Sequence, residues 1–119
     1  MIAITAQGER LDSQVDGRFG RCEYFILYDE QTKQYTAHPN PSRNASSGAG
    51  VGAAQFLVDS EVATLITGQV GPKAMRALKA AELDVYTVSK GTVETAISAY
   101  LNGELEQVNA ATVTHNFGK

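Results

Sequence analysis

Two glycine-rich turns in this sequence have the composition of anion-binding sites. Residues 67–74 are TGQVGPKA and residues 47–52 are SGAGVG, and each turn opens a segment with helical periodicity. Glycine permits a tight backbone turn, and a proline at the first helical position lacks only an N–H that has no helical partner there. The remaining amides face whatever lies beyond the helix end, so each turn predicts an anion site. Ordinary loop chemistry explains one such turn, but two in one small chain favour a function. The candidate glycines are Gly48, Gly50, Gly68 and Gly71.

Two arginines in the first long loop are candidate partners for the same anion. Arg18 and Arg21 flank a Phe-Gly pair, and their forked guanidinium groups suit a ligand rich in anionic oxygen or sulfur. The alternative is that one or both pair with neighbouring carboxylates instead. The candidate carboxylates are Asp16, Glu23 and Asp29.

Lys73 and Gln69 are secondary candidates in the turn at 67–74. Lys73 falls in the first turn of the expected helix, where a cation opposes the helix dipole. A bound anion would offset that cost. The alternative is that Lys73 is an ordinary lysine exposed to solvent, with no ligand.

Metal ligation has weaker support. Soft metals prefer thiolate, thioether or imidazole ligands, and this sequence offers Cys22, His38 and His115 without any short paired spacing. Cys22 precedes an apolar strand and is most simply a small buried residue. His38 ends a strand, and His115 lies near the end of the chain. The three remain candidates, and the metal is unknown.

Composition and motifs exclude several other functions. The 119 residues carry a net charge of −3, whereas nucleic acids and anionic membranes attract a basic surface. The first apolar strand has no carboxylate for a two-metal nuclease, and neither a Gly-x-Ser-x-Gly elbow nor a Walker-type lysine loop is present. A single cysteine and the lack of a leader-like segment predict a cytoplasmic protein without a disulfide.

The apolar periodicity predicts a single α/β domain over residues 1–105, followed by a C-terminal tail over 106–119. The expected strands are 2–6, 24–29, 34–38, 62–67 and 84–88, and the expected helices are 50–59, 72–82 and 93–101. Helical crossovers make the first, third, fourth and fifth strands parallel, while the short early connections make the second antiparallel. The predicted sheet therefore has five strands in the mixed order 3-2-1-4-5. Ligands bind such sheets beyond the strand ends, at the switch point between strands one and four.

These motifs together resemble the dinitrogenase iron-molybdenum cofactor biosynthesis family. The resemblance is carried by DGRFGR at 16–21, YFILYD at 24–29, GAGV at 48–51, TGQVGPKA at 67–74 and the helix pattern at 93–101. The matching group is NifX-like and NafY-like and includes the orange-protein branch, which carries a molybdenum-copper sulfide cluster. The resemblance implies a ribonuclease H-like three-layer α/β fold.

The resemblance also implies a non-enzymatic carrier of an anionic metal-sulfur cluster that contains molybdenum or iron, with a cluster donor or acceptor protein as partner. Family members often have a histidine just before the turn at 48–50, where this chain has Ser46 and Ser47. This departure weakens the case for histidine ligation and favours a cluster held by amides and cations. The alternatives are a module that binds phosphate or a nucleotide-type metabolite, and a protein-interaction domain without a ligand.

Overall fold

A six-stranded mixed sheet forms the centre of the computed structural model, which describes residues 1–110. The strands lie in the order β3-β2-β1-β4-β5-β6. Their bounds are β1 Ile2–Ala6, β2 Tyr24–Tyr28, β3 Tyr35–Pro39, β4 Thr64–Thr67, β5 Asp84–Thr87 and β6 Glu106–Val108. β1 pairs in parallel with β4, β4 pairs in parallel with β5, and the β1–β2, β2–β3 and β5–β6 pairs are antiparallel.

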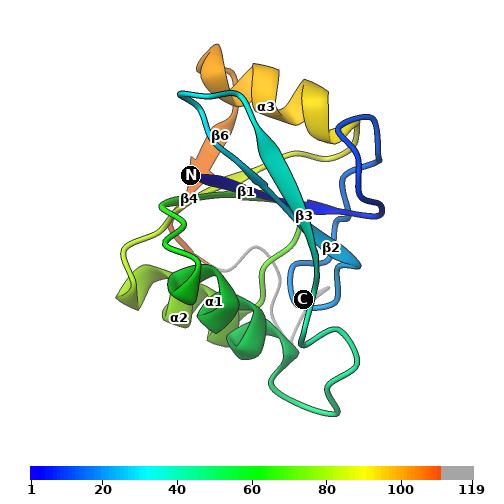
Figure 1. Ribbon diagram of the computed structural model, residues 1–119. Helices are drawn as coiled ribbons and strands as arrows, with labels where there is room; N and C mark the ends of the chain where they lie inside the picture. Colours follow the sequence, from blue (N-terminus) through cyan, green and yellow to red (C-terminus); the bar gives the residue numbers. More distant parts are fainter. Residues whose placement is uncertain (111–119) are drawn as a thin grey trace.

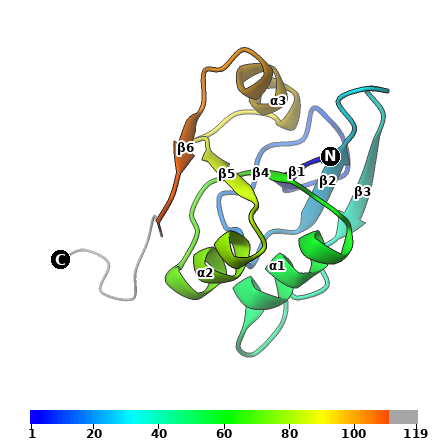
Figure 2. The same ribbon diagram turned by 90° about the vertical axis from the view of Figure 1, so that its left-hand side faces the viewer.

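Three helices cover the two faces of this sheet. α1 (Ala49–Asp59) and α2 (Pro72–Ala80) lie side by side on one face, and α3 (Val93–Leu101) covers the other (Figures 1 and 2). The apolar residues accordingly form two clusters. Phe25, Leu57, Leu65 and Leu78 belong to the cluster beneath α1 and α2, and Ile4, Ile66 and Ile97 to the one beneath α3.

The predicted strand order and directions are confirmed for the first five strands. β1 lies in the interior of the sheet, as the crossover lengths require. Thr92 caps α3, because its hydroxyl accepts a hydrogen bond from the Thr95 amide and the Thr95 side chain accepts one from the Thr92 amide. The ribonuclease H-like classification remains a prediction.

The prediction of a five-stranded sheet is wrong, because the sheet has a sixth strand. Glu106–Val108, at the start of the expected tail, pairs with β5 as a sixth strand. This strand has three residues and is largely exposed, so its sequence carries little apolar alternation. Tertiary pairing with the free edge of β5 determines its conformation.

None of the helices within residues 1–110 combines the length and the apolar character that a membrane span requires.

Candidate anion-binding cleft

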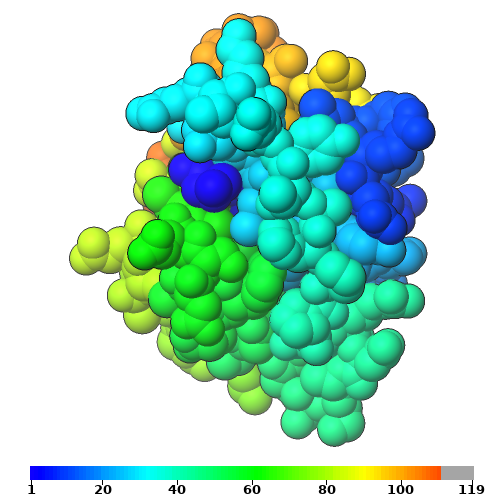
Figure 3. Space-filling model, viewed as in Figure 1, coloured from blue at the N-terminus to red at the C-terminus, as the bar shows by residue number. Residues whose placement is uncertain are grey.

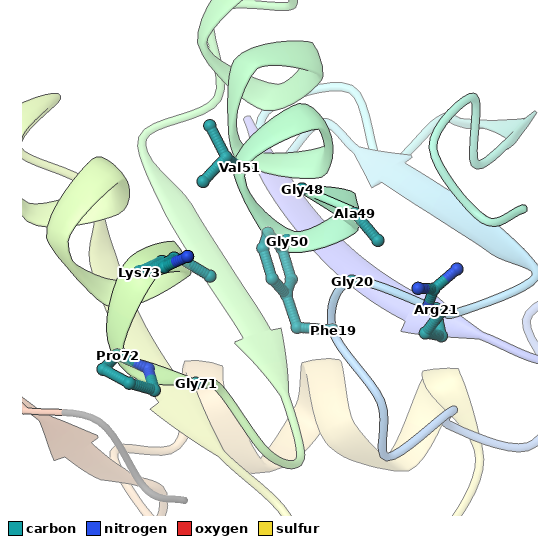
Figure 4. A pocket seen from close by; sticks show the side chains of 11 residues that line it. Phe19, Gly20, Arg21, Gly48, Ala49, Gly50, Val51, Gly71, Pro72 and Lys73 are labelled. Atoms are coloured by element: carbon teal, nitrogen blue, oxygen red, sulfur yellow. The ribbon is translucent and has the colours of Figure 1, made fainter. Parts of the chain in front are cut away.

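The amino ends of α1 and α2 meet over the loop at 16–23 and form a cleft with a volume of about 680 Å³. Figure 4 shows Phe19 between the two helix ends, with Lys73 on the α2 side and Arg21 on the opposite side. Phe19 is 1% exposed and forms the floor. The complete lining is Phe19, Gly20, Arg21, Gly48, Ala49, Gly50, Val51, Gly71, Pro72, Lys73 and Ala74.

Both helices present their positive ends to the cleft. Gly48 and Gly71 are the N-cap residues, and neither helix has a side-chain cap or an acidic residue in its first turn within the described part of the chain. The first intrahelical hydrogen bonds run from Gly52 N to Gly48 O and from Met75 N to Gly71 O, both at 2.9 Å. The amides that precede these bonds are the groups with which helix ends bind anions.

The glycines of the two turns differ in backbone conformation and in the space around them. Gly48 adopts a φ of 72°, a left-handed conformation that favours glycine. Gly50 is in tight contact with α2, because a Cβ built on it would lie 2.9 Å from the Ala74 Cβ. Gly71 has extended backbone angles, and a Cβ built on it would meet nothing within 4 Å. Gly48 and Gly71 therefore both have open space where a Cβ would stand, but only Gly71 has a backbone conformation that other residues adopt readily.

Arg21 joins the cleft to the neighbouring loop. Its Nη1 donates to the carbonyl oxygens of Arg43 and Ala45, at 2.9 and 2.7 Å. The guanidinium thus orders the segment that leads into α1 and adds a positive charge to the cleft lining.

Arg18 lies outside this cleft and is paired with Asp16. Its Nε and Nη2 each donate to the carboxylate at 3.0 Å, while the Arg18 and Glu23 amides also donate to it. The Asp16 side chain is only 2% exposed, whereas that of Arg18 is 61% exposed. The carboxylate raises the pKa of Arg18 through the hydrogen bonds and its charge. The alternative of carboxylate pairing is therefore confirmed for Arg18, and its partner is Asp16.

Gly68 and Gln69 accompany Arg18 in a second, separate pocket of about 520 Å³. The Gln69 amide donates to Gly17 O at 2.7 Å, and the Phe19 amide donates to Gln69 O at 3.2 Å. A Cβ on Gly68 would lie 2.6 Å from the Gly17 Cα, so this glycine permits two loops to pack closely. These residues hold the floor of the cleft in place.

Cys22 is fully buried in the core beneath α1 and α2. Burial, with a smaller contribution from the charge of Asp16, raises the pKa of its thiol from the ordinary 9.0 to about 12. Metals bind the thiolate, which is the form that this environment disfavours. The packing interpretation of Cys22 agrees with this geometry.

His38 is not part of the cleft lining. His38 lies on β3, with its Nε2 2.8 Å from Thr36 Oγ1 and its ring 5.8 Å from that of Phe56. His115 lies outside the described residues. Within residues 1–110, no group of three or more histidine, cysteine, aspartate or glutamate side chains could hold a metal ion.

The cleft thus combines helix amides and two cations with apolar walls. Five of the predicted site residues line it, namely Arg21, Gly48, Gly50, Gly71 and Lys73. Sequence reasoning did not select the apolar wall, Ala49, Val51, Pro72 and Ala74, although these residues are interleaved with the glycines that it did select. Phe19 and Gly20 belong to the motif at 16–21, but nothing in the sequence shows that they lie beneath the helix ends.

Comparisons with known proteins identify relatives of similar length. A sequence profile described as dinitrogenase iron-molybdenum cofactor matches residues 1–103. The apo form of the orange protein from Desulfovibrio gigas has a similar structure, with 40% identity, a TM-score of 0.90 and coverage of 93% of this chain and 94% of that one. A Thermotoga protein described as a candidate NifB protein of the DUF35 family is 38% identical, with a TM-score of 0.82 and coverage of 93% and 95%. An uncharacterized protein from Methanocaldococcus jannaschii is 29% identical over 89% of both chains.

Proposed function

This chain belongs to the dinitrogenase iron-molybdenum cofactor family, and from this membership we propose that it carries an anionic metal-sulfur cluster as cargo. The observation that carries the proposal is the charge of the cleft. Two helix amino ends, Lys73 and Arg21 meet in a lining that contains no carboxylate. Positive potential of this kind favours an anion.

The chemistry of the walls favours sulfide over phosphate as the surface of that anion. Phe19, Ala49, Val51 and Pro72 present carbon to the ligand, and a polarisable sulfide surface is less costly to desolvate against carbon than phosphate oxygens are. The lining offers no thiolate or imidazole. The cluster would therefore keep its own sulfide ligands and be held by amides and cations. A molybdenum- or iron-containing thioanion fits this description.

We assign the cleft a binding role without turnover. The lining contains no histidine, carboxylate, tyrosine or thiol that could act as a general acid or base, and its ionisable side chains are one arginine and one lysine. A carrier instead needs a protein that supplies the cluster and one that accepts it. An oxygen-sensitive sulfide cargo also suits a reducing cytoplasm. Arg18, Gly68 and Gln69 support the site by holding the loop at 16–23.

Anaerobic titration with tetrathiomolybdate tests this function. We expect saturable binding with altered charge-transfer absorption, and molybdenum retained after gel filtration. Lys73→Gln should weaken binding by about tenfold, the loss of one charge-assisted hydrogen bond. Lys33→Gln is the matched control, since Lys33 is exposed in the turn between β2 and β3.

Inorganic phosphate and ATP, titrated in parallel, distinguish the alternatives. Tight phosphate or ATP binding without thiomolybdate binding would make the protein a metabolite-binding module. If the protein binds neither tetrathiomolybdate, phosphate nor ATP, the carrier proposal fails and the protein-interaction domain is the remaining interpretation.

A further inference from the structure

We propose that the outer side of α1 and α2 is a docking face for an acidic protein. The docking face comprises Val51 and Val58 on α1 and Lys73, Arg76 and Lys79 on α2. The two helices pack side by side, so their outer sides form one continuous surface (Figure 2). Figure 3 shows the outer side of α1, in green, uncovered.

The α1 part of this face is nearly uncharged and carries two exposed valines, whereas a surface helix is ordinarily charged. Val51 is 44% exposed and Val58 is 38% exposed, and the two valines lie two helical turns apart on the same side. The single charged residue of α1 is Asp59 at its last position. The exposed Gln55 lies between the two valines. Helices that face only solvent carry charged and polar residues along their outer side, so a nearly uncharged side with two exposed valines favours a protein partner.

The α2 part of the face is cationic. Lys73, Arg76 and Lys79 are all exposed, and the helix contains no carboxylate. Within residues 1–110 the ion pairs are Arg10–Asp12 and Arg18–Asp16, so none involves α2. Three of the ten basic residues of an acidic chain are thus gathered on one nine-residue helix. A surface that pairs carboxylates with apolar side chains complements this arrangement.

The docking face is continuous with the cleft. Val51 and Lys73 belong to both, whereas Val58, Arg76 and Lys79 lie outside the cleft lining. A protein seated on the face would therefore cover the cleft opening. The inference goes beyond cargo binding, because docking requires no cluster.

Site-specific photo-crosslinking tests the proposal in the cells that make this protein. A benzoylphenylalanine at position 58 should form an adduct with one acidic protein, and the same probe at position 101 should not, because Leu101 is equally apolar, 53% exposed and on the opposite face. The adduct protein, purified, is then the binding probe for the cluster-free chain. Arg76→Glu and Val58→Ser should each weaken its binding at least tenfold, and added salt should weaken binding to the parent protein. Lys33→Glu and Leu101→Ser are the matched controls and should leave binding unchanged.

Several results would overturn the docking face. These are adducts at position 58 no stronger than at position 101, crosslinks only to a second copy of this chain, an adduct with nucleic acid, or binding that is unaffected by Arg76→Glu and Val58→Ser. Tetrathiomolybdate binding by the same two variants separates this inference from the proposed function. Retained thiomolybdate binding with lost docking supports the docking face as distinct from the cargo site. Lost docking together with lost thiomolybdate binding and a lower melting temperature would mean that the variants only damage the fold, and would overturn the assignment.

Discussion

Gly50 and Ala74 meet at the point where the amino ends of α1 and α2 converge. A Cβ on Gly50 would approach the Ala74 Cβ to 2.9 Å, which is closer than carbon atoms pack. Gly20 adds to this contact from below, since its own Cβ would lie 2.8 Å from the Gly50 amide nitrogen. The width of the cleft is therefore set by a three-way contact that tolerates no added side chain.

Gly50→Val should destabilise the protein. Overpacking of this kind costs about 1–3 kcal/mol. Gly71→Val should cost less, about 0.5–1 kcal/mol, because valine is a poor N-cap but its side chain would meet open space. Urea denaturation measures both values. Similar losses for the two variants would contradict the difference in packing. If Gly71→Val weakens thiomolybdate binding and Gly50→Val does not, Gly71 lies against the bound ligand.

Substitutions of Arg21 and of Arg18 should differ in their effect on thiomolybdate binding. Arg21→Gln removes a cation from the cleft and is expected to weaken thiomolybdate binding by about tenfold. Arg18→Gln should leave binding nearly unchanged at temperatures where the variant is folded, since Arg18 faces Asp16 and a different pocket. Calorimetric titration at two salt concentrations measures the effect, and the parent protein should lose affinity as salt rises. Equal losses for both arginines would place Arg18 in the site.

Asp16 should be the most sensitive polar residue of the loop at 16–23. Its buried carboxylate accepts hydrogen bonds from the amides of Arg18 and Glu23 and from the Arg18 guanidinium. Asp16→Ala leaves those two amides without this acceptor, and we expect a loss of about 2–4 kcal/mol in the free energy of unfolding. Asp12→Ala is the control, since Asp12 pairs with Arg10 at an exposed position. A loss no greater than that of the control would show that the loop does not depend on Asp16.

Cys22 should make stability fall at high pH. The folded protein holds the thiol proton up to about pH 12, whereas the unfolded chain releases it near the ordinary pKa of 9.0. The unfolded state therefore binds fewer protons in this interval, so the stabilising contribution is complete below pH 9 and declines between pH 9 and 12. Tyrosines also titrate in that range. The difference between the parent and Cys22→Ala, followed by chemical denaturation, isolates the thiol.

A second measurement on Cys22 needs no variant. Iodoacetamide at pH 8 should modify the unfolded chain readily and the native protein only slowly, because the thiol is both buried and protonated. Rapid modification of the native protein would show that the Cys22 thiol is accessible and reactive, and Cys22 would again be a candidate metal ligand.

The sheet was predictable because its constraints are local. The short turn between β2 and β3 and the helical crossovers to β4 and β5 leave few arrangements. The central strands are apolar runs bounded by polar or glycine-rich segments, which locates each of them to within a few residues. Glu106–Val108 escaped prediction because its conformation depends on a distant partner, β5.

The site was less predictable, because side-chain direction within a loop has no sequence period. Arg18 and Arg21 are three residues apart with similar neighbours, yet one bonds a buried carboxylate and the other the carbonyls of Arg43 and Ala45. Gly50 lies inside the first turn of α1 and Gly71 is the N-cap of α2, and the sequence does not show that Gly50 contacts Ala74 while Gly71 has open surroundings.

The uncapped amino ends of α1 and α2 also make the empty protein the weaker form. A helix end with glycine in place of a side-chain cap gives up only a few tenths of a kcal/mol, and a bound anion would add its own favourable interaction with the helix dipole, about 0.3–1 kcal/mol per helix. A ligand present at a hundred times its dissociation constant would add about 2.7 kcal/mol to the free energy of unfolding by mass action alone. Loaded molecules would consequently unfold less often and meet proteases less often than empty ones. The lifetime of the carrier in the cell would thus follow its cargo, and unused copies would be removed first.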